Sequence, residues 1–168
     1  MWYVRAKTGL SKEELNEKLK SFIRDSAFFH KMFDDYGISM DRIDNDLHFH
    51  LEPLDGMHAR SKGKDVFLDD ELFKDGDFFE DKIHFVVHEM SHWLTRLREN
   101  DCYFADPEEI EAFTLGMAYE LLKGRGEREV AKLFFPIISK HLKISENADV
   151  LFGSLLTKAK IRVKRFGI

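Results

Sequence analysis

The segment from Ile83 to Leu94, IHFVVHEMSHWL, constrains the fold more than any other part of the chain. Its apolar residues recur at alternating spacings of four and three, which predicts an amphipathic α-helix with one buried face. That face consists of Ile83, Val87, Met90, Leu94 and Leu97. Asp77 and Glu80 form a cap-like pair just upstream. We therefore expect a helix from Phe78 to about Arg98.

Three histidines and one glutamate interrupt this apolar segment. His88 and His92 are four residues apart, so on a helix they lie about 40° apart around the axis and one turn along it. Both imidazoles can therefore bind one metal ion, at the roughly 2.0–2.1 Å typical of zinc. Glu89 follows His88, where its carboxylate reaches a water on the metal. The pattern is H-E-x-x-H, in which two histidines hold zinc and the glutamate acts as general base.

A metal-free interpretation makes His88 and His92 hydrogen-bonded histidines beside a core face. It is less favoured, because two buried imidazoles and a carboxylate need polar partners and one metal ion satisfies all three. His84 lies one turn before His88, and three such histidines span roughly 12 Å, too far for one ion. We expect His84 beside a ligand histidine or at the surface. His48 and His50 share one face of an expected strand and should be partly exposed.

A catalytic zinc site needs a third protein ligand and an open position for water. The next helix, expected from Asp106 to about Lys123, supplies three candidates: Glu108, Glu109 and Glu111. Glu109 is preferred, because Ala112 and Gly116 share its row and let the helix approach the motif closely. Each of the three also suits a helix N-terminus without any metal. The choice among them therefore stays open.

HEMSHW followed by EEIEAFTLGMAYELL resembles the zinc-dependent gluzincin peptidases, and the layout is closest to small ImmA/IrrE-like and minimal gluzincin domains. The resemblance covers about Ile83 to Leu122. In such domains a later helix carries E-x-x-A, whose glutamate is the third zinc ligand, and that pattern falls on Glu109. The sequence departs from the family at Phe113, where Asp or Asn is usual. A hydrogen bond to a ligand histidine must then come from elsewhere, with Asp101 and Asp106 as candidates.

The resemblance also implies an exposed edge strand that pairs with extended substrate. We assign this role to KDVFLDD, centred on Val66, Phe67 and Leu68. Val66 and Leu68 can fill the core at the same time, because successive side chains of a strand face opposite ways. Tyr103 lies between the motif and the third ligand, where gluzincins can carry a tyrosine that stabilises the oxyanion. Tyr119 is the alternative for that role.

The order of the expected elements indicates an α+β, zincin-like fold with a small N-terminal mixed sheet and a helical C-terminal half. The expected strands are WYVRAK (2–7), DLHFHLE (46–52) and KDVFLDD. The further expected helices are one opened by the Ser11/Glu14 capping box, SAFFHKMF ending before Gly37, Glu127 to His141 bent near Pro136, and one opened by Ser145. We expect a single domain over residues 1–168, with the metal-site core at about 78–123 and a helical part with a basic tail at 124–168.

Charge is distributed unevenly along the chain. The net charge is −5, yet Val150 to Ile168 holds five cations and no acid. Such a tail allows contact with nucleic acid, but a solvated helix end whose cations suit the dipole is favoured. The single cysteine, Cys102, cannot form an internal disulfide, and we find neither a signal-peptide pattern nor a long apolar run. We expect a cytoplasmic protein without membrane association.

These features together predict a zinc metallopeptidase, more specifically an endopeptidase, acting on a peptide or protein substrate. His88, His92 and Glu109 would hold Zn²⁺, and Glu89 would be the general base. The alternative is a catalytically silent zincin-like domain that binds zinc and serves as an interaction protein. The sequence does not indicate the oligomeric state or the cleavage specificity.

Overall fold

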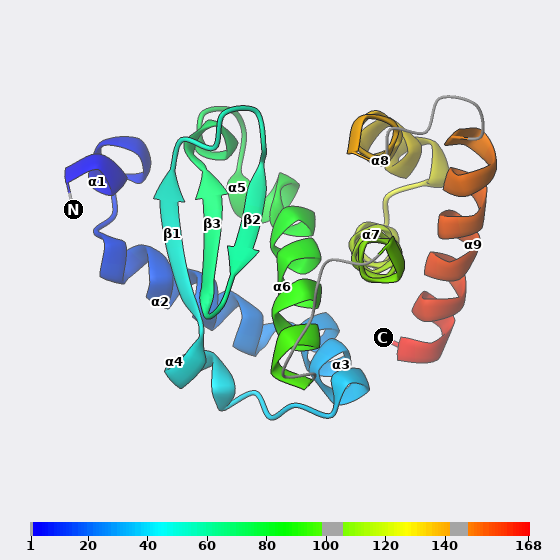
Figure 1. Ribbon diagram of the computed structural model, residues 1–168, viewed down its shortest axis with the longest axis horizontal. Helices are drawn as coiled ribbons and strands as arrows, with labels where there is room; N and C mark the ends of the chain where they lie inside the picture. Colours follow the sequence, from blue (N-terminus) through cyan, green and yellow to red (C-terminus); the bar gives the residue numbers. More distant parts are fainter. Residues whose placement is uncertain (1, 99–105, 142–147) are drawn as a thin grey trace. The chain divides into compact units, whose positions relative to one another are not determined.

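The computed structural model describes residues 2–98, 106–141 and 148–168 (Figure 1). They belong to two compact units, unit 1 at Met1–Tyr103 and unit 2 at Phe104–Ile168. Helices predominate and the strands form one small mixed sheet, which confirms the α+β class. The single zincin-like domain expected from the sequence stays a prediction.

Unit 1 contains the sheet and the motif helix. Its elements are α1 (Trp2–Thr8), α2 (Lys12–Asp25), α3 (Ala27–Tyr36), α4 (Arg42–Asp46), β1 (His48–Glu52), β2 (Ala59–Lys62), β3 (Asp65–Asp69), the 3₁₀-helix η1 (Asp70–Phe73), α5 (Phe78–Asp81) and α6 (Ile83–Arg98). Unit 2 consists of α7 (Asp106–Leu122), α8 (Glu127–His141) and α9 (Ala148–Phe166). In the described part of the chain, no helix combines the length and the apolar composition that crossing a bilayer requires.

Local signals define the ends of α2 and α3, as expected. Ser11 Oγ accepts a hydrogen bond from the Glu14 backbone N–H at 3.1 Å, and the Glu14 carboxylate accepts one from the Ser11 N–H at 2.6 Å. This capping box satisfies two backbone donors that the first turn of a helix leaves unpaired. Gly37 ends α3 in the left-handed region, at φ 67°, where a residue without Cβ is favoured.

The first element, α1, is a helix, so the prediction of a strand over residues 2–7 was wrong. Six residues are too few to separate a period of two from a period of 3.6. The helical spacing puts Tyr3 and Lys7 on one face, and both reach Asp70 on η1. The Tyr3 hydroxyl donates to Asp70 Oδ2 at 2.5 Å, and Lys7 Nζ lies 3.2 Å from the same oxygen. These contacts attach α1 to the rest of unit 1.

The Tyr3–Asp70 contact should make stability depend on pH at both extremes. The hydrogen bond from Tyr3, with Lys7 beside it, lowers the pKa of Asp70 below 3.8, so this stabilisation is present above pH 3.8 and is lost as pH falls through the lowered value. Burial, together with the hydrogen bond to Asp70, raises the pKa of Tyr3 from 10.0 to about 12. The stabilisation that the neutral Tyr3 hydroxyl gives to the folded state is therefore complete below pH 10 and is lost as pH rises towards 12.

We expect Tyr3→Phe to lower the free energy of unfolding by about 1–2 kcal/mol near pH 7, the usual range for a hydrogen bond to a charged group. The difference from wild type should shrink below pH 3.8 and again above pH 10. Urea titrations at a series of pH values measure it. A difference that stays constant from pH 3 to pH 11 would contradict the linkage.

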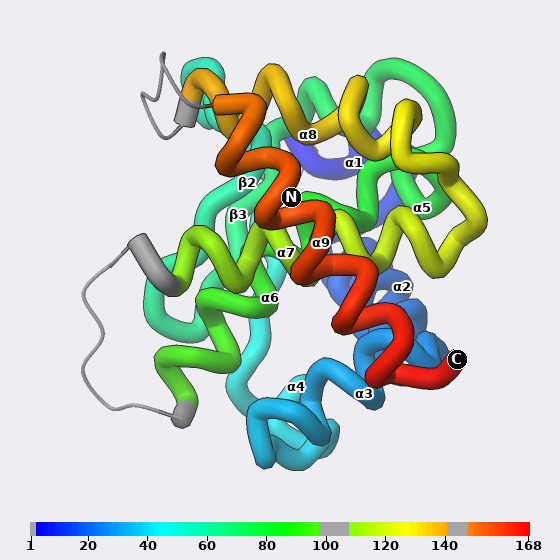
Figure 2. The backbone as a smooth tube through the Cα atoms, turned by 90° about the vertical axis from the view of Figure 1, so that its right-hand side faces the viewer, coloured from blue at the N-terminus to red at the C-terminus, as the bar shows by residue number. Residues whose placement is uncertain are grey.

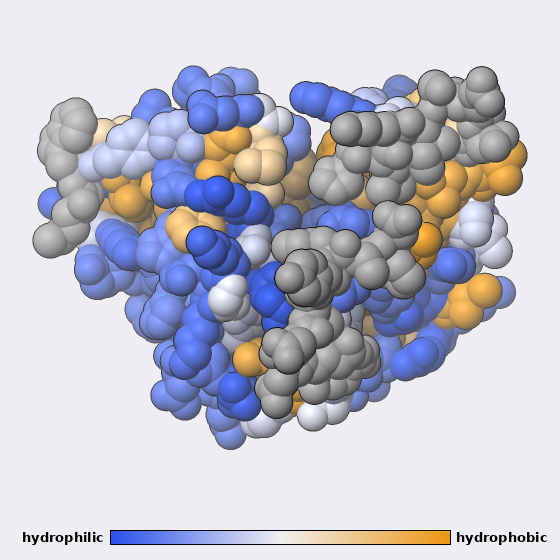
Figure 3. All heavy atoms as spheres, viewed as in Figure 1, coloured by the Kyte–Doolittle hydropathy of each residue, from blue (hydrophilic) through white to orange (hydrophobic). Residues whose placement is uncertain are grey.

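The sheet has the strand order β1-β3-β2, with β1 parallel and β2 antiparallel to β3. Its inward face carries four buried apolar side chains: Phe49, Leu51, Val66 and Leu68. On this side β1 contacts α2 and β2 contacts α6, while α3 packs on α6 (Figure 1). The outward face is turned to the viewer in Figures 1 and 3 and is mainly hydrophilic.

The strand β3 is central, so the prediction that KDVFLDD forms an exposed edge was wrong. The backbone of β3 pairs with β1 on one side and β2 on the other, which leaves no free edge for a substrate strand. Val66 and Leu68 are fully buried and serve the core. Phe67 points outward, with its ring stacked on His50 at 4.9 Å and the Arg60 guanidinium 4.8 Å from its centre. Strand addition at these three residues is therefore not available.

The two outer strands differ in how their edges are covered. The Asn16 side chain on α2 pairs with the backbone of Phe49 on β1: its Nδ2 donates to the Phe49 carbonyl and its Oδ1 accepts from the Phe49 N–H, each at 2.8 Å. An amide side chain thus takes the place of a neighbouring strand there. On β2, the His58 carbonyl accepts from the Asp69 N–H at 2.9 Å. Since antiparallel pairing alternates, the backbone groups of Ala59 and Ser61 point to the outer edge.

The helix expected from Phe78 to Arg98 divides at Lys82 into α5 and α6. Asp77 caps α5 as expected, because its side chain accepts hydrogen bonds from the backbone of Phe79 and Glu80. Lys82 has φ −121° and ψ 0°, outside helical geometry. The motif therefore stands on a separate helix of 16 residues.

In unit 2, α7 is buried on all sides from Ala112 to Glu120, and α9 lies against it (Figure 2). The Glu120 side chain is fully buried and pairs with Arg125 Nε at 2.5 Å. Loss of Arg125 would leave the buried Glu120 carboxylate without this compensating charge. The helices expected around residues 106–123 and 127–141 are both present. Two predictions, Asp106 as a helix cap and Ser145 as the start of the last helix, fall on side chains that lie outside the described part of the chain.

Candidate metal centre

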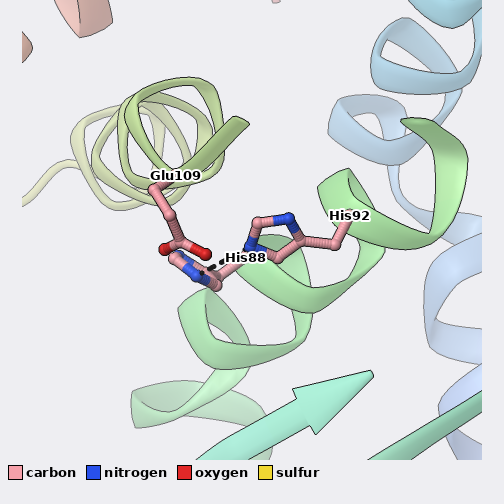
Figure 4. A group of neighbouring side chains, drawn as sticks. All are labelled: His88, His92 and Glu109. Carbon is pink, nitrogen blue, oxygen red and sulfur yellow. Dashed lines mark hydrogen bonds between the residues drawn. The ribbon is translucent and has the colours of Figure 1, made fainter. Parts of the chain in front are cut away.

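The two motif histidines lie together on α6. His88 and His92 occupy successive turns, and their Nε2 atoms are 3.3 Å apart (Figure 4). Two zinc–nitrogen bonds of about 2.0–2.1 Å at a tetrahedral angle place the nitrogens about 3.3–3.4 Å apart. The separation of the two nitrogens is therefore compatible with binding of one zinc ion.

Glu89 lies beside this pair and is almost enclosed. Its side chain is 7% exposed, whereas His92 is 2% exposed and His88 is partly exposed. On a helix, Glu89 is about 100° around the axis from His88, so its carboxylate lies beside the direction in which the two rings point. The arrangement gives two nitrogen donors, one adjacent carboxylate and access from solvent at His88.

Buried contacts on the other side of α6 hold the motif in place. The hydroxyls of Tyr36 on α3 and Ser91 are 2.8 Å apart, and the Trp93 Nε1–H donates to the Asp46 carbonyl at 3.3 Å. Trp93 is fully buried, and its ring centre lies 6.1 Å from that of Phe33. Ser91 and Trp93, on either side of His92, thus attach the motif helix to α3 and α4.

His84, His48 and His50 differ in their burial. His84 is only 3% exposed and its ring contacts Phe85 at 4.3 Å, so the expectation that it could lie at the surface was wrong. His48 is exposed, and the partly exposed His50 pairs through Nε2 with Asp65 Oδ1 at 2.6 Å. The partial exposure expected of these histidines is confirmed for His50, whereas His48 is more exposed than expected.

The candidate third ligands lie in the first turns of α7, and Figure 4 includes Glu109 on that helix. Glu111 accepts a hydrogen bond from Arg162 on α9 at 2.6 Å. Since residues two apart on a helix point about 200° apart, Glu109 and Glu111 face nearly opposite sides of α7. Glu111 thus serves the packing of α9 on α7 within unit 2, while Glu109 as zinc ligand stays a prediction.

A group of acidic side chains that we did not expect lies at the end of β3. Carboxylate oxygens of Asp69, Asp70 and Glu71 come within 4.8 Å of one another. Asp69 accepts from the backbone N–H of Leu54 at 2.7 Å and of Glu71 at 2.8 Å, and Asp70 binds Tyr3 and Lys7. Asp69 thus caps η1, and Asp70 attaches α1 to η1.

Several predicted residues cannot be placed. Tyr103, the candidate for oxyanion stabilisation, lies outside the described residues, as do Asp101 and Cys102. Tyr119, the alternative, is a buried residue of α7 with the Lys123 ammonium 5.8 Å from its ring centre.

The strand β2 is a functional candidate that was not predicted from the sequence, because its residues ARSK include no β-branched or aromatic side chain.

Comparison with protein-family models, with curated proteins and with solved structures gives no match to this chain.

Proposed function

We propose that the protein is a zinc-dependent peptidase in which His88 and His92 hold the metal, with Glu109 as the third protein ligand. The observation that carries the proposal is the 3.3 Å separation of the two Nε2 atoms on α6, which fits two ligands of one tetrahedral ion. Glu89 beside them completes the H-E-x-x-H set. The resemblance of residues 83–122 to gluzincin peptidases supports the third ligand.

The proposed reaction is hydrolysis of a peptide bond. When bound, zinc supplies Lewis-acid chemistry that lowers the pKa of water and polarises a carbonyl oxygen. Glu89 accepts the proton of the attacking water and donates it to the leaving amine. The enclosure of Glu89 keeps bulk water away from this proton, and the partly exposed His88 marks the side from which substrate arrives.

The substrate strand is assigned to β2 in place of β3. The outward backbone groups of Ala59 and Ser61 can pair with an extended peptide, whereas Asn16 already occupies the edge of β1 at Phe49. β2 also packs beside α6, which bears the motif. An extended chain added along β2 would run next to the motif helix.

Zinc binding is the first test. We expect the wild type to hold about one equivalent of zinc by elemental analysis, and His88→Ala/His92→Ala to hold almost none. Glu109→Ala should lower the zinc affinity at least about tenfold in a chelator competition titration. Mutation of a residue that only hydrogen-bonds to a zinc ligand already lowers metal affinity about 10–100-fold. Glu111→Ala is the matched control, since that carboxylate is bound by Arg162, and its zinc affinity should stay within about threefold of the wild type.

Cleavage is measured on an unfolded casein substrate with and without chelator. Hydrolysis that stops on chelation and returns with zinc supports the peptidase. Zinc binding without any hydrolysis would instead indicate the catalytically silent zinc-binding protein. Less than a tenth of an equivalent of zinc in the wild type would overturn both the peptidase and the zinc-binding protein without activity.

A further inference from the structure

Over the part of the motif helix that precedes Arg96, solvent reaches two neighbouring positions. From Ile83 to Thr95, each described side chain of α6 is buried except those of Phe85 and His88. Exposure of His88 follows from the metal site, because a catalytic zinc must be reachable. Exposure of a phenylalanine on the same side has no such explanation, and burial of a phenylalanine ring is favourable by about 1.5–3 kcal/mol.

Phe85 lies one turn before the proposed catalytic group. It precedes His88 by three residues and Glu89 by four, so it is about 60° and 40° from them around the axis and about 4.5 and 6 Å from them along it. Successive residues of an extended peptide advance about 3.3 Å. The side chain of a residue next to the scissile bond therefore comes within reach of the Phe85 ring.

A second ring extends this surface towards β2. The centre of the His58 ring lies 4.7 Å from that of Phe85, and His58 is exposed immediately before β2 begins. The backbone of His58 is held by the Asp69 N–H. The preceding Met57 is 51% exposed, the most exposed large hydrophobic residue that the structure describes in unit 1. One end of the outer strand β2 thus carries aromatic and apolar side chains next to α6.

We propose that Phe85 and His58 form the recognition surface for a large apolar or aromatic substrate side chain next to the scissile bond. The inference rests on the proposed peptidase function and deepens it by naming the substrate class. Phe85 acts as a specificity-determining residue: it contacts the substrate side chain and takes no part in the proton transfers of Glu89. The substrate segment is extended along β2, with its apolar side chain against the two rings.

The size of the effect follows from the chemistry of the surface. A hydrophobic contact that gains or loses one or a few methylene groups changes kcat/KM by about 10–200-fold. We therefore expect the wild type to prefer phenylalanine or leucine over alanine at that position by at least about tenfold. Phe85→Ala should remove most of this preference, chiefly by lowering kcat/KM for the Phe peptide.

The test begins with a random peptide library, whose cleavage products identify the preferred position by mass spectrometry. Two synthetic peptides that differ only by Phe or Ala at that position then give kcat/KM for the wild type, Phe85→Ala and Phe85→Leu. Phe79→Ala is the matched control: Phe79 is also partly exposed, and its ring contacts Phe22, Phe78 and the Lys18 ammonium on α2 and α5. It should keep the wild-type preference.

A binding measurement separates recognition from chemistry and from folding. In the Glu89→Gln background, fluorescence anisotropy of the labelled Phe peptide should show at least about fivefold weaker binding when Phe85→Leu or His58→Ala is added. Zinc content and thermal midpoint of these variants report on the metal site and the fold. Equal preference in wild type and Phe85→Ala, with cleavage intact, overturns the inference and leaves the peptidase standing. Absence of cleavage by the wild type and by all variants overturns both the recognition surface and the proposed peptidase function.

Discussion

Glu89→Gln is expected to lower kcat for peptide hydrolysis about 10²–10⁴-fold while the zinc content remains that of the wild type. A general base contributes about this factor, and glutamine keeps the shape of the side chain but cannot accept the proton of water. Glu89 follows His88 in the motif and is 7% exposed, so a base from bulk solvent has poor access to the same proton. Steady-state kinetics on a fluorogenic peptide, with elemental analysis of the same samples, measure both quantities.

Glu80→Gln is the control for this experiment. Glu80 is an exposed acid on α5, nine residues before Glu89 and outside the motif, and its replacement should change kcat less than about twofold. A Glu89→Gln protein that keeps wild-type kcat would remove the general-base role. Loss of zinc together with activity would show instead that Glu89 is needed for metal binding.

Trp93→Ala is expected to lower the free energy of unfolding of unit 1 by about 3–5 kcal/mol, the cost of replacing a large buried aromatic residue by alanine. Trp93 is fully buried in the middle of the motif helix, contacts Phe33 and donates to the Asp46 carbonyl. The change therefore creates a cavity behind His92 and also leaves a buried carbonyl without this donor. Urea denaturation followed by far-UV circular dichroism measures the loss.

Trp93→Phe separates the two contributions. It keeps one six-membered ring but removes the hydrogen bond and the five-membered ring of the indole, so an intermediate loss of about 1–3 kcal/mol is expected. Zinc affinity should fall further in Trp93→Ala than in Trp93→Phe, because α6 must hold both histidines in fixed directions. A loss below 1 kcal/mol for Trp93→Ala would mean that the helix is held chiefly by its other contacts.

Elements whose limits depend on nearby residues agree with their predictions. The Ser11/Glu14 box begins α2 and Gly37 ends α3. The apolar stripe from Ile83 to Leu94 is buried as expected, but most other side chains of α6 are buried as well, so the expectation of one buried face was too narrow. Each signal acts within one or two turns, so no distant segment is needed to interpret it. The break at Lys82 was missed, because a cap-like pair just before an apolar stripe is equally compatible with one helix or two.

The predictions that were wrong concern elements whose structure depends on contacts with segments far away in the chain. Residues 2–7 form a helix because Tyr3 and Lys7 both bind Asp70, some 65 residues further along the chain. KDVFLDD is a strand as expected, yet its place at the centre of the sheet depends on β2, a segment without strand-like composition. The accessibility of Phe85 and its contact with His58 likewise depend on how β2 packs beside α6.

The sequence by itself determined the relation among His88, Glu89 and His92, because the 3.6-residue period of a helix sets their directions whatever surrounds them. It also determined which face of that helix is apolar. Only the tertiary structure decided which strand is central in the sheet, that Arg162 binds Glu111, and that Phe85 is partly exposed beside His58. The physical reason is that strand pairing and side-chain burial are settled between segments far apart in the chain, where local periodicity carries no information.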